Sequence, residues 1–285
     1  QIQKFPNKIL INGPKGIGKK ILINHFLNYF YSKNKNKIYD LKKNEFKLNN
    51  NLSKLITTNS HPNIFKIKKK KDKKIIDIDQ IREMIQFTNQ TSFNNDRRFI
   101  IIEDINLLGI NSANALLKSI EEPNKKTYFI LINNSEFKIL ETIKSRCLEF
   151  KSNLLNSEVI EIVNYYFNSD IYKDINLDFI NNYNSPSFLI SLVNFLETND
   201  LSIKECNIEG LLTHIIKNKS YASDEFIKEY LNLFIELFFH KNINNSRKIS
   251  FKIKKYFYLK LSFVKKYNLD FESFFLEFND KLLSE

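Results

Sequence analysis

The residues best suited to chemistry lie in residues 13–20, a glycine-rich segment with the sequence GPKGIGKK. An apolar run, residues 8–12, precedes it, and a stretch with helical spacing, residues 21–27, follows it. A strand, a glycine loop and a helix in this order predict a phosphate-binding loop, in which backbone N–H groups and the helix N-terminus face the anion. Lys19 stands where such a loop places the lysine that reaches the β- and γ-phosphates.

The next residue, Lys20, departs from the usual pattern of such loops. The pattern places a serine or threonine there, whose hydroxyl group holds Mg²⁺. An ammonium group cannot ligate a metal ion, and its charge repels one. The segment therefore predicts phosphate binding more firmly than nucleotide hydrolysis. A tight strand-to-helix turn without any ligand is the alternative.

Two other apolar runs end in polar residues that could complete such a site. Glu103 and Asp104 follow residues 99–102, which have the composition of a buried parallel strand. At the carboxyl end of such a strand, one carboxylate could hold Mg²⁺ and the other could orient or deprotonate water, although Asp104 could also cap a helix. Asn133 ends the run 127–132 and could sense the γ-phosphate or position water. The candidate nucleotide-binding residues are Gly13, Pro14, Gly16, Gly18, Lys19, Lys20 and Asn133.

Apolar periodicity places these candidates in an α/β domain. Extended and helical runs alternate up to residue 150, which predicts a parallel sheet with helices on both faces. Asp79 is the expected cap of a helix over residues 79–87. After residue 150 the periodic runs are helical, and residues 226–238 carry an aromatic stripe that is typical of a helix facing a core. The predicted strands are residues 8–12, 61–67, 75–78, 99–102, 127–132 and 148–150.

The composition bounds the class of protein. Its 285 residues suggest two domains, its two cysteines fit a reducing cytoplasm, and its four histidines lack metal-ligand spacing. No apolar run approaches the length of a membrane helix. The net charge of +12 favours an anionic partner, although the Lys- and Asn-rich bias of the whole sequence produces the same charge without that purpose. The lysine run in residues 68–74 is typical of a solvated loop tip, with a phosphate-backbone contact as the alternative.

Two motifs point to a known family. Residues 114–123, NALLKSIEEP, have the pattern of a helix that a proline ends, and residues 145–147 are Ser-Arg-Cys. Together with residues 61–62 and 79–82, they resemble the delta-prime subunits of bacterial DNA polymerase III clamp loaders, within the AAA+ superfamily. The resemblance covers residues 8–150, and the helical second half agrees with the family in character and position only.

The resemblance implies a nucleotide-binding domain at residues 1–150, a helical lid at 151–200 and a helical collar at 201–285. It implies a cytoplasmic subunit of a pentameric, ATP-driven machine that loads the sliding clamp onto primed DNA. Delta-type and gamma/tau-type subunits would be its direct partners. Arg146 stands where the family carries an arginine finger, which acts in trans on the nucleotide of the neighbouring subunit. The alternative for Arg146 is a surface salt bridge.

Several departures from the active members of the wider family concern turnover. Lys20 replaces the hydroxyl residue, the pair Glu103 and Asp104 reverses the usual Asp-Glu order, and residues 184–187 lack the lid arginine. They predict that the chain binds ATP weakly or not at all, argue against Mg²⁺, and predict no hydrolysis by the chain alone. The four-cysteine zinc module is missing from residues 32–60, so no zinc is expected.

Two other functions stay open from the sequence. The intact loop lysine and the two acids favour a self-sufficient AAA+ ATPase of the clamp-loader motor type. The lysine run would serve a generic basic module that binds nucleic acid, which no recognition motif supports.

Overall fold

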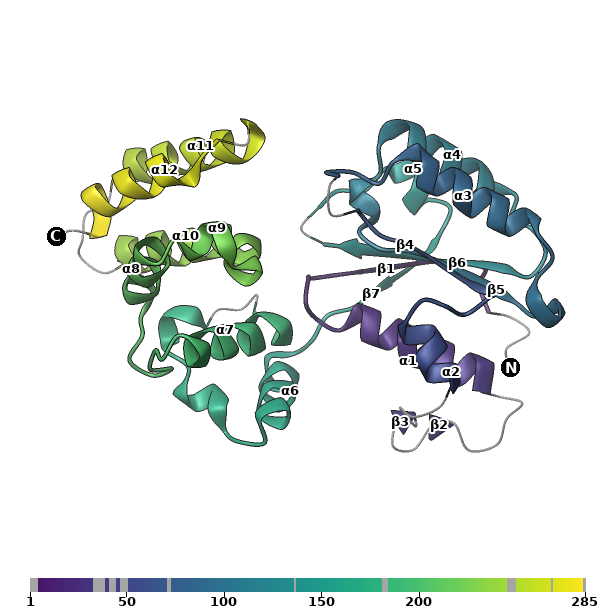
Figure 1. Ribbon diagram of the computed structural model, residues 1–285, viewed down its shortest axis with the longest axis horizontal. Helices are drawn as coiled ribbons and strands as arrows, with labels where there is room; N and C mark the ends of the chain where they lie inside the picture. Colours follow the sequence, from purple (N-terminus) through teal and green to yellow (C-terminus); the bar gives the residue numbers. More distant parts are fainter. Residues whose placement is uncertain are drawn as a thin grey trace. The chain divides into compact units, whose positions relative to one another are not determined.

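The computed structural model describes residues 5–32, 39–40, 45–46, 51–70, 73–135, 137–180, 184–244, 250–267 and 269–283. The chain divides into two compact units, residues 1–154 and residues 155–285 (Figure 1). Among the described residues, no helix is both long enough and apolar enough to cross a membrane.

The first unit is built on a parallel sheet of five strands. Its strand order is β4-β5-β6-β1-β7, and every neighbouring pair is parallel. The predicted α/β domain with a parallel sheet is therefore confirmed. The strand that enters the glycine loop, β1, lies between β6 and β7, so polar residues at the ends of these strands meet the loop. The strands are β1 (Lys8–Gly13), β4 (Ile64–Ile67), β5 (Arg98–Ile102), β6 (Thr127–Asn134) and β7 (Leu148–Lys151).

Helices cover both faces of this sheet, as the alternating pattern predicts. Figure 1 shows α1 and α2 on one face and α3 and α4 on the other. Each face has its own buried core: Ile23, Leu27 and Ile56 belong to the α1/α2 side, and Met84 and Leu116 to the α3/α4 side. The helices of this unit are α1 (Lys19–Ser32), α2 (Asn51–Thr57), α3 (Ile78–Asn89), α4 (Ile110–Glu121) and α5 (Glu141–Lys144), with short helical turns at Phe93–Asn95 and Ile105–Leu107. A small antiparallel pair joins β2 (Tyr39–Asp40) and β3 (Glu45–Phe46).

The segment before α3 differs from the sequence prediction. The run 75–78 is not a strand of the sheet; Ile76 forms an isolated bridge with Leu108 and is fully buried. The helix begins at Ile78, and its cap is Asp77, whose carboxylate accepts a hydrogen bond from the Gln80 backbone N–H. The expected cap, Asp79, is instead an exposed residue of the first turn that pairs with Arg82. Two aspartates in one turn offer equivalent cap signals, and the bridge at Ile76 decides between them.

The lysine run lies between β4 and α3, as a loop. Residues 71 and 72 are outside the described residues, and Lys68, Lys69 and Lys70 are exposed. Lys73 pairs with Asp77, so part of the positive charge is compensated inside the protein.

The second unit is helical throughout its described residues, as predicted. The aromatic stripe on α10 belongs to its core, where Phe234 and Phe238 are fully buried. A single short turn covers Leu177–Phe179, and residues 181–183 lie outside the described residues. The helices are α6 (Asn156–Phe167), α7 (Pro186–Thr198), α8 (Ile208–Lys217), α9 (Ser220–Ser223), α10 (Glu225–Asn244), α11 (Phe251–Tyr267) and α12 (Phe271–Phe278), with short turns at Ile171–Asp174, Leu177–Phe179 and Asn279–Leu283.

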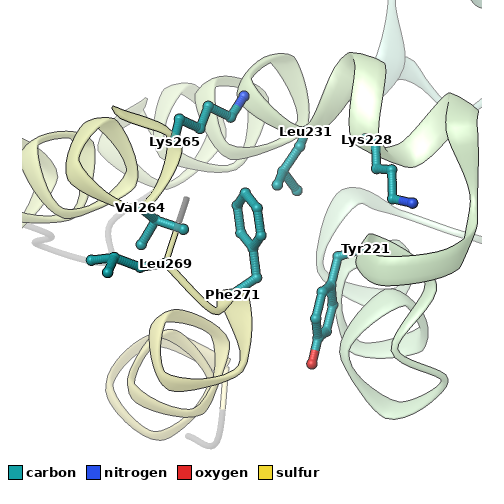
Figure 2. Close-up of a pocket in the computed structure, with 7 residues that line it drawn as sticks. All are labelled: Tyr221, Lys228, Leu231, Val264, Lys265, Leu269 and Phe271. Atoms are coloured by element: carbon teal, nitrogen blue, oxygen red, sulfur yellow. The ribbon is translucent and has the colours of Figure 1, made fainter. Parts of the chain in front are cut away.

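A cavity of about 380 Å³ lies within this second unit. The ring of Phe271 lies between the side chains of Val264 and Tyr221, and two lysine side chains complete the lining (Figure 2). One of them, Lys265, donates a hydrogen bond of 2.7 Å to Asn232 Oδ1, and burial lowers its pKa. The cavity is lined by Tyr221, Lys228, Leu231, Val264, Lys265, Leu269 and Phe271.

Candidate nucleotide site and arginine cluster

The glycine loop has the geometry of a phosphate-binding turn. It leaves β1 at Gly13 and enters α1 at Lys19. Gly16 and Gly18 have φ angles of 82° and 91°, in the region that glycine adopts without steric cost. Gly13 is needed for a different reason, because a Cβ atom there would lie 2.1 Å from the backbone oxygen of Ser152. The glycines of the motif are thus required by the backbone, whether or not a ligand binds.

The side chain of Lys19 is buried against its own loop, with a residue exposure of only 6%. Its ammonium group donates hydrogen bonds to the backbone oxygens of Gly13 and Pro14, at 2.7 and 2.6 Å. It also donates to Oδ1 of Asn134, at 3.0 Å. These three acceptors match the three donor hydrogens of an ammonium group. The loop lysine is therefore held by the protein itself.

Lys20, the residue that replaces the usual hydroxyl, forms an ion pair with Glu103. Its Nζ lies 2.6 Å from Glu103 Oε2; the lysine side chain is 60% exposed and the glutamate only 16%. A third lysine, Lys66 of β4, donates to the backbone oxygen of Ile56. Burial lowers the pKa of Lys66, the charge of Glu103 opposes this shift, and the charge of Lys20 adds to it. Lys66 therefore lies close to Lys20 and Glu103, which the sequence did not predict.

The second acid, Asp104, is tied to the end of β6. It has left-handed backbone angles, with φ 51° and ψ 56°, and starts a short helical turn without a side-chain cap hydrogen bond. Its Oδ1 accepts a hydrogen bond of 2.7 Å from Asn134 Nδ2. Since the amide oxygen of Asn134 accepts from Lys19, one asparagine joins the loop lysine to the acid.

The two asparagines that end β6 face opposite sides. Asn133, the predicted contact, donates from Nδ2 to Asn12 Oδ1 at 3.0 Å, and Asn12 in turn donates to Glu149. This ladder runs across three strands and lowers the pKa of Glu149. Asn134 is therefore the asparagine that contacts Lys19, whereas Asn133 contacts Asn12. The alternation of a strand explains the difference: adjacent residues point to opposite faces.

Arg146 lies between α5 and β7 and is part of a different cluster. Its Nε donates to Glu121 Oε1 at 2.7 Å, and its Nη1 donates to the backbone oxygen of Thr142 at 2.9 Å. The arginine and glutamate side chains are 37% and 47% exposed. The surface salt bridge considered from the sequence is therefore present. The neighbouring Cys147 is half-buried, and burial raises its pKa to about 11, which suits a packing residue.

The sheet separates this arginine from the phosphate loop. Arg146 precedes β7, and Leu148 of β7 pairs with Ile9 near the start of β1. The loop begins at Gly13, four residues farther along β1, or about 13 Å in a strand. Arg146 therefore lies at the amino ends of the strands, whereas Lys19, Glu103 and Asn134 lie at their carboxyl ends.

Comparison with known proteins places the first unit in a family. A family model described as "DNA polymerase III, delta subunit" matches residues 1–155, more than half of the chain. The chain belongs to this family. The match ends at residue 155, where the second unit begins. The fold and the motifs around Arg146 thus agree with the resemblance found in the sequence.

Individual relatives agree with the DNA polymerase III assignment. The DNA polymerase III subunit delta' of Pseudomonas aeruginosa is 33% identical over 140 residues, which cover 49% of this chain and 41% of the relative. The subunit delta' of Buchnera aphidicola subsp. Schizaphis graminum is 32% identical over 169 residues, covering 59% and 49%. That of Buchnera aphidicola subsp. Acyrthosiphon pisum is 26% identical over 277 residues, covering 90% and 79%. The chain thus spans less than half the length of the first two relatives.

The sequence argued against a bound Mg²⁺ or zinc ion, and the relevant feature of the structure is the grouping of side chains that could ligate one. Within them, no three His, Cys, Asp or Glu side chains come together in a group that could hold a metal ion. The region considered for a zinc module is only partly described, since residues 33–38, 41–44 and 47–50 lie outside. In this member of the DNA polymerase III delta family, the two acids beside the glycine loop, Glu103 and Asp104, contact Lys20 and Asn134 respectively.

Proposed function

We propose that this chain acts as a delta-prime-type subunit of a bacterial clamp loader and supplies Arg146 to the ATP site of a neighbouring subunit. In this role it helps an ATP-driven complex load the sliding clamp onto primed DNA in the cytoplasm. Its direct partners are delta-type and gamma/tau-type subunits, and it meets the clamp and DNA through the assembled complex. Residues 151–200 would act as the lid and residues 201–285 as the collar.

The position of Arg146 carries this proposal. The arginine lies across the sheet from its own phosphate loop, too far away to serve a nucleotide bound there. Its guanidinium is partly exposed and is held by one exposed carboxylate, Glu121. A planar guanidinium that stays charged can meet phosphate oxygens with two donors at once. Family membership and this placement together support a role in trans.

The phosphate loop supports the second part of the proposal, which is weak or absent hydrolysis by the chain itself. A nucleotide phosphate would have to compete with the loop oxygens for the ammonium of Lys19. Lys20 takes the place of the metal-holding hydroxyl. We propose that ATP binds here weakly and that the nucleotide turned over belongs to the neighbour.

The decisive experiment is the DNA- and clamp-stimulated ATPase rate of a loader reconstituted with this chain, comparing the wild type with Arg146→Ala. Arginine fingers contribute about 10³-fold or more at the site they serve, so we expect turnover at that one site to be lost and the total rate to fall by at least that site's share. Lys125→Ala is the control, because it removes a positive charge from an exposed position of the same unit outside these motifs. Gel filtration must show equal assembly. An unchanged rate with Arg146→Ala contradicts the proposal.

A motor-type ATPase is the second candidate, and one observation favours it. Lys19, Asn134 and Asp104 form one connected group beside the loop, as a working nucleotide site requires. This candidate predicts magnesium-dependent turnover by the purified chain, whereas the leading proposal predicts a rate at background.

A further inference from the structure

The place of a metal ion in this loop is filled by a side chain. A phosphate loop of the usual kind holds Mg²⁺ through the hydroxyl after its lysine, with a carboxylate from a neighbouring strand close by. Here the Lys20 ammonium lies 2.6 Å from Glu103 Oε2, and Asp104 Oδ1 accepts the Asn134 amide. An ammonium has no lone pair to offer a metal. Mg²⁺ therefore does not fit this set of groups.

The charges around the loop balance without a metal ion. Lys19 and Lys20 carry two positive charges, and Glu103 and Asp104 carry two negative charges. With a serine in place of Lys20, the net charge of these four positions would fall to −1, so a phosphate would be attracted less strongly. Lys66 adds further positive charge nearby, since its pKa responds to both Lys20 and Glu103.

Lys20 can also reach a ligand. Its side chain is 60% exposed, and it emerges at the start of α1, where a phosphate would meet the helix N-terminus. Because the Lys20 side chain is mostly exposed, water and salt screen its ion pair with Glu103 and water can solvate the ammonium when the pair opens. The ammonium can thus turn from Glu103 to an entering phosphate oxygen, which a charge-assisted hydrogen bond would hold.

We propose that Lys20 replaces the divalent cation of this phosphate loop, so that a nucleoside triphosphate binds to the chain without Mg²⁺. The inference rests on the proposed role of residues 13–20 as a nucleotide loop. It extends that role by proposing that the Lys20 ammonium takes the place of Mg²⁺, so that the ligand is a nucleotide without a bound metal ion. The free ATP anion, which Mg²⁺-dependent sites bind poorly, is the expected form.

The test is titration calorimetry of the full chain with ATP, once in excess Mg²⁺ and once in EDTA. For the wild type we expect apparent binding at least about fivefold tighter in EDTA than in excess Mg²⁺, because Mg²⁺ in solution removes the free ATP anion that the site takes. For Lys20→Ser, which restores the usual hydroxyl, we expect binding at least about tenfold weaker in EDTA than in Mg²⁺. Lys125→Ser is the control: it removes the same charge from an exposed turn before β6, at the opposite edge of the sheet.

Two results overturn the inference. Wild-type binding that weakens about tenfold or more in EDTA would mean that a metal enters despite Lys20. Wild-type binding in neither condition would mean that Lys20 serves no ligand. This second result leaves the Arg146 proposal intact, because a finger in trans needs no nucleotide in its own subunit. If Lys20→Ser does not fold, as judged by circular dichroism, the two wild-type titrations still decide.

Discussion

Two charged regions of the first unit differ in how completely their charged groups are hydrogen-bonded within the protein. The loop cluster, defined as Lys19, Lys20, Glu103, Asp104 and Asn134, is closed on itself, with a buried lysine bonded to three oxygens.

The arginine cluster is the contrasting region, and it consists of Arg146, Glu121 and Thr142. Its guanidinium is 37% exposed and is held by one exposed carboxylate and one backbone oxygen. Removing a partner is costly in a buried network and cheap at an exposed surface. Because Arg146 is exposed, it can exchange Glu121 for a ligand on another chain at little cost, whereas Lys19 would lose buried hydrogen bonds if it left the loop.

The largest effect is expected from Arg146→Lys, which keeps the charge but removes the planar fork. A lysine can still pair with Glu121, so the free energy of unfolding should change by less than about 1 kcal/mol. The ATPase rate of the reconstituted loader should nevertheless fall as far as with Arg146→Ala, because a point charge does not replace bidentate contacts. Rates and urea unfolding curves measure the two effects. A fully active Arg146→Lys loader would make the cluster a matter of charge alone.

A smaller effect, and on stability alone, is expected from Lys19→Met. The substitution keeps the volume but leaves the oxygens of Gly13, Pro14 and Asn134 without this donor. We expect a loss of about 1–3 kcal/mol in the free energy of unfolding, measured by urea titration. Lys125→Met, at an exposed position, should leave it unchanged. A loss of loader ATPase as large as that of the Arg146 variants would instead favour the motor-type function.

The smallest effect is expected from Glu121→Gln, which weakens the hold on Arg146. Both side chains are exposed, so the free energy of unfolding should fall by no more than about 0.5–1 kcal/mol. Loader ATPase should stay at the wild-type rate, because the guanidinium remains available to the neighbour. A rate as low as that of Arg146→Lys would show that Glu121 positions the arginine. The protein would then hold Arg146 in place as firmly as it holds Lys19.

Much of this architecture could be predicted from local patterns. The apolar run before residue 13, the glycines and the helical spacing after Lys19 predict β1, the loop and α1 correctly, since each depends on neighbours along the chain. The change from alternating elements to helices predicts a domain boundary at residue 150, which stays a prediction; the compact units of the structure divide after residue 154. The division of the helical half at residue 200 stays a prediction.

The sequence does not decide between neighbouring residues that have the same chemistry. Asn133 and Asn134 are the same residue type, and only the register of Gly13 opposite Asn134 brings the second one to the loop. Asp77 and Asp79 are both good caps, and the bridge between Ile76 and Leu108 selects the first. A pattern of residue types cannot distinguish such pairs, because their difference is a direction in space.

The sequence by itself determined the strand–loop–helix unit, the parallel sheet, the helical second half and the family motifs around Arg146. These features follow from periodicity, from glycine and from short spacings, which act locally. Only the tertiary structure decided that Lys20 pairs with Glu103, that Asn134 joins Lys19 to Asp104, and that Arg146 lies across the sheet from the loop. Each of these joins segments far apart in the chain, and the order and register of the strands bring such segments together.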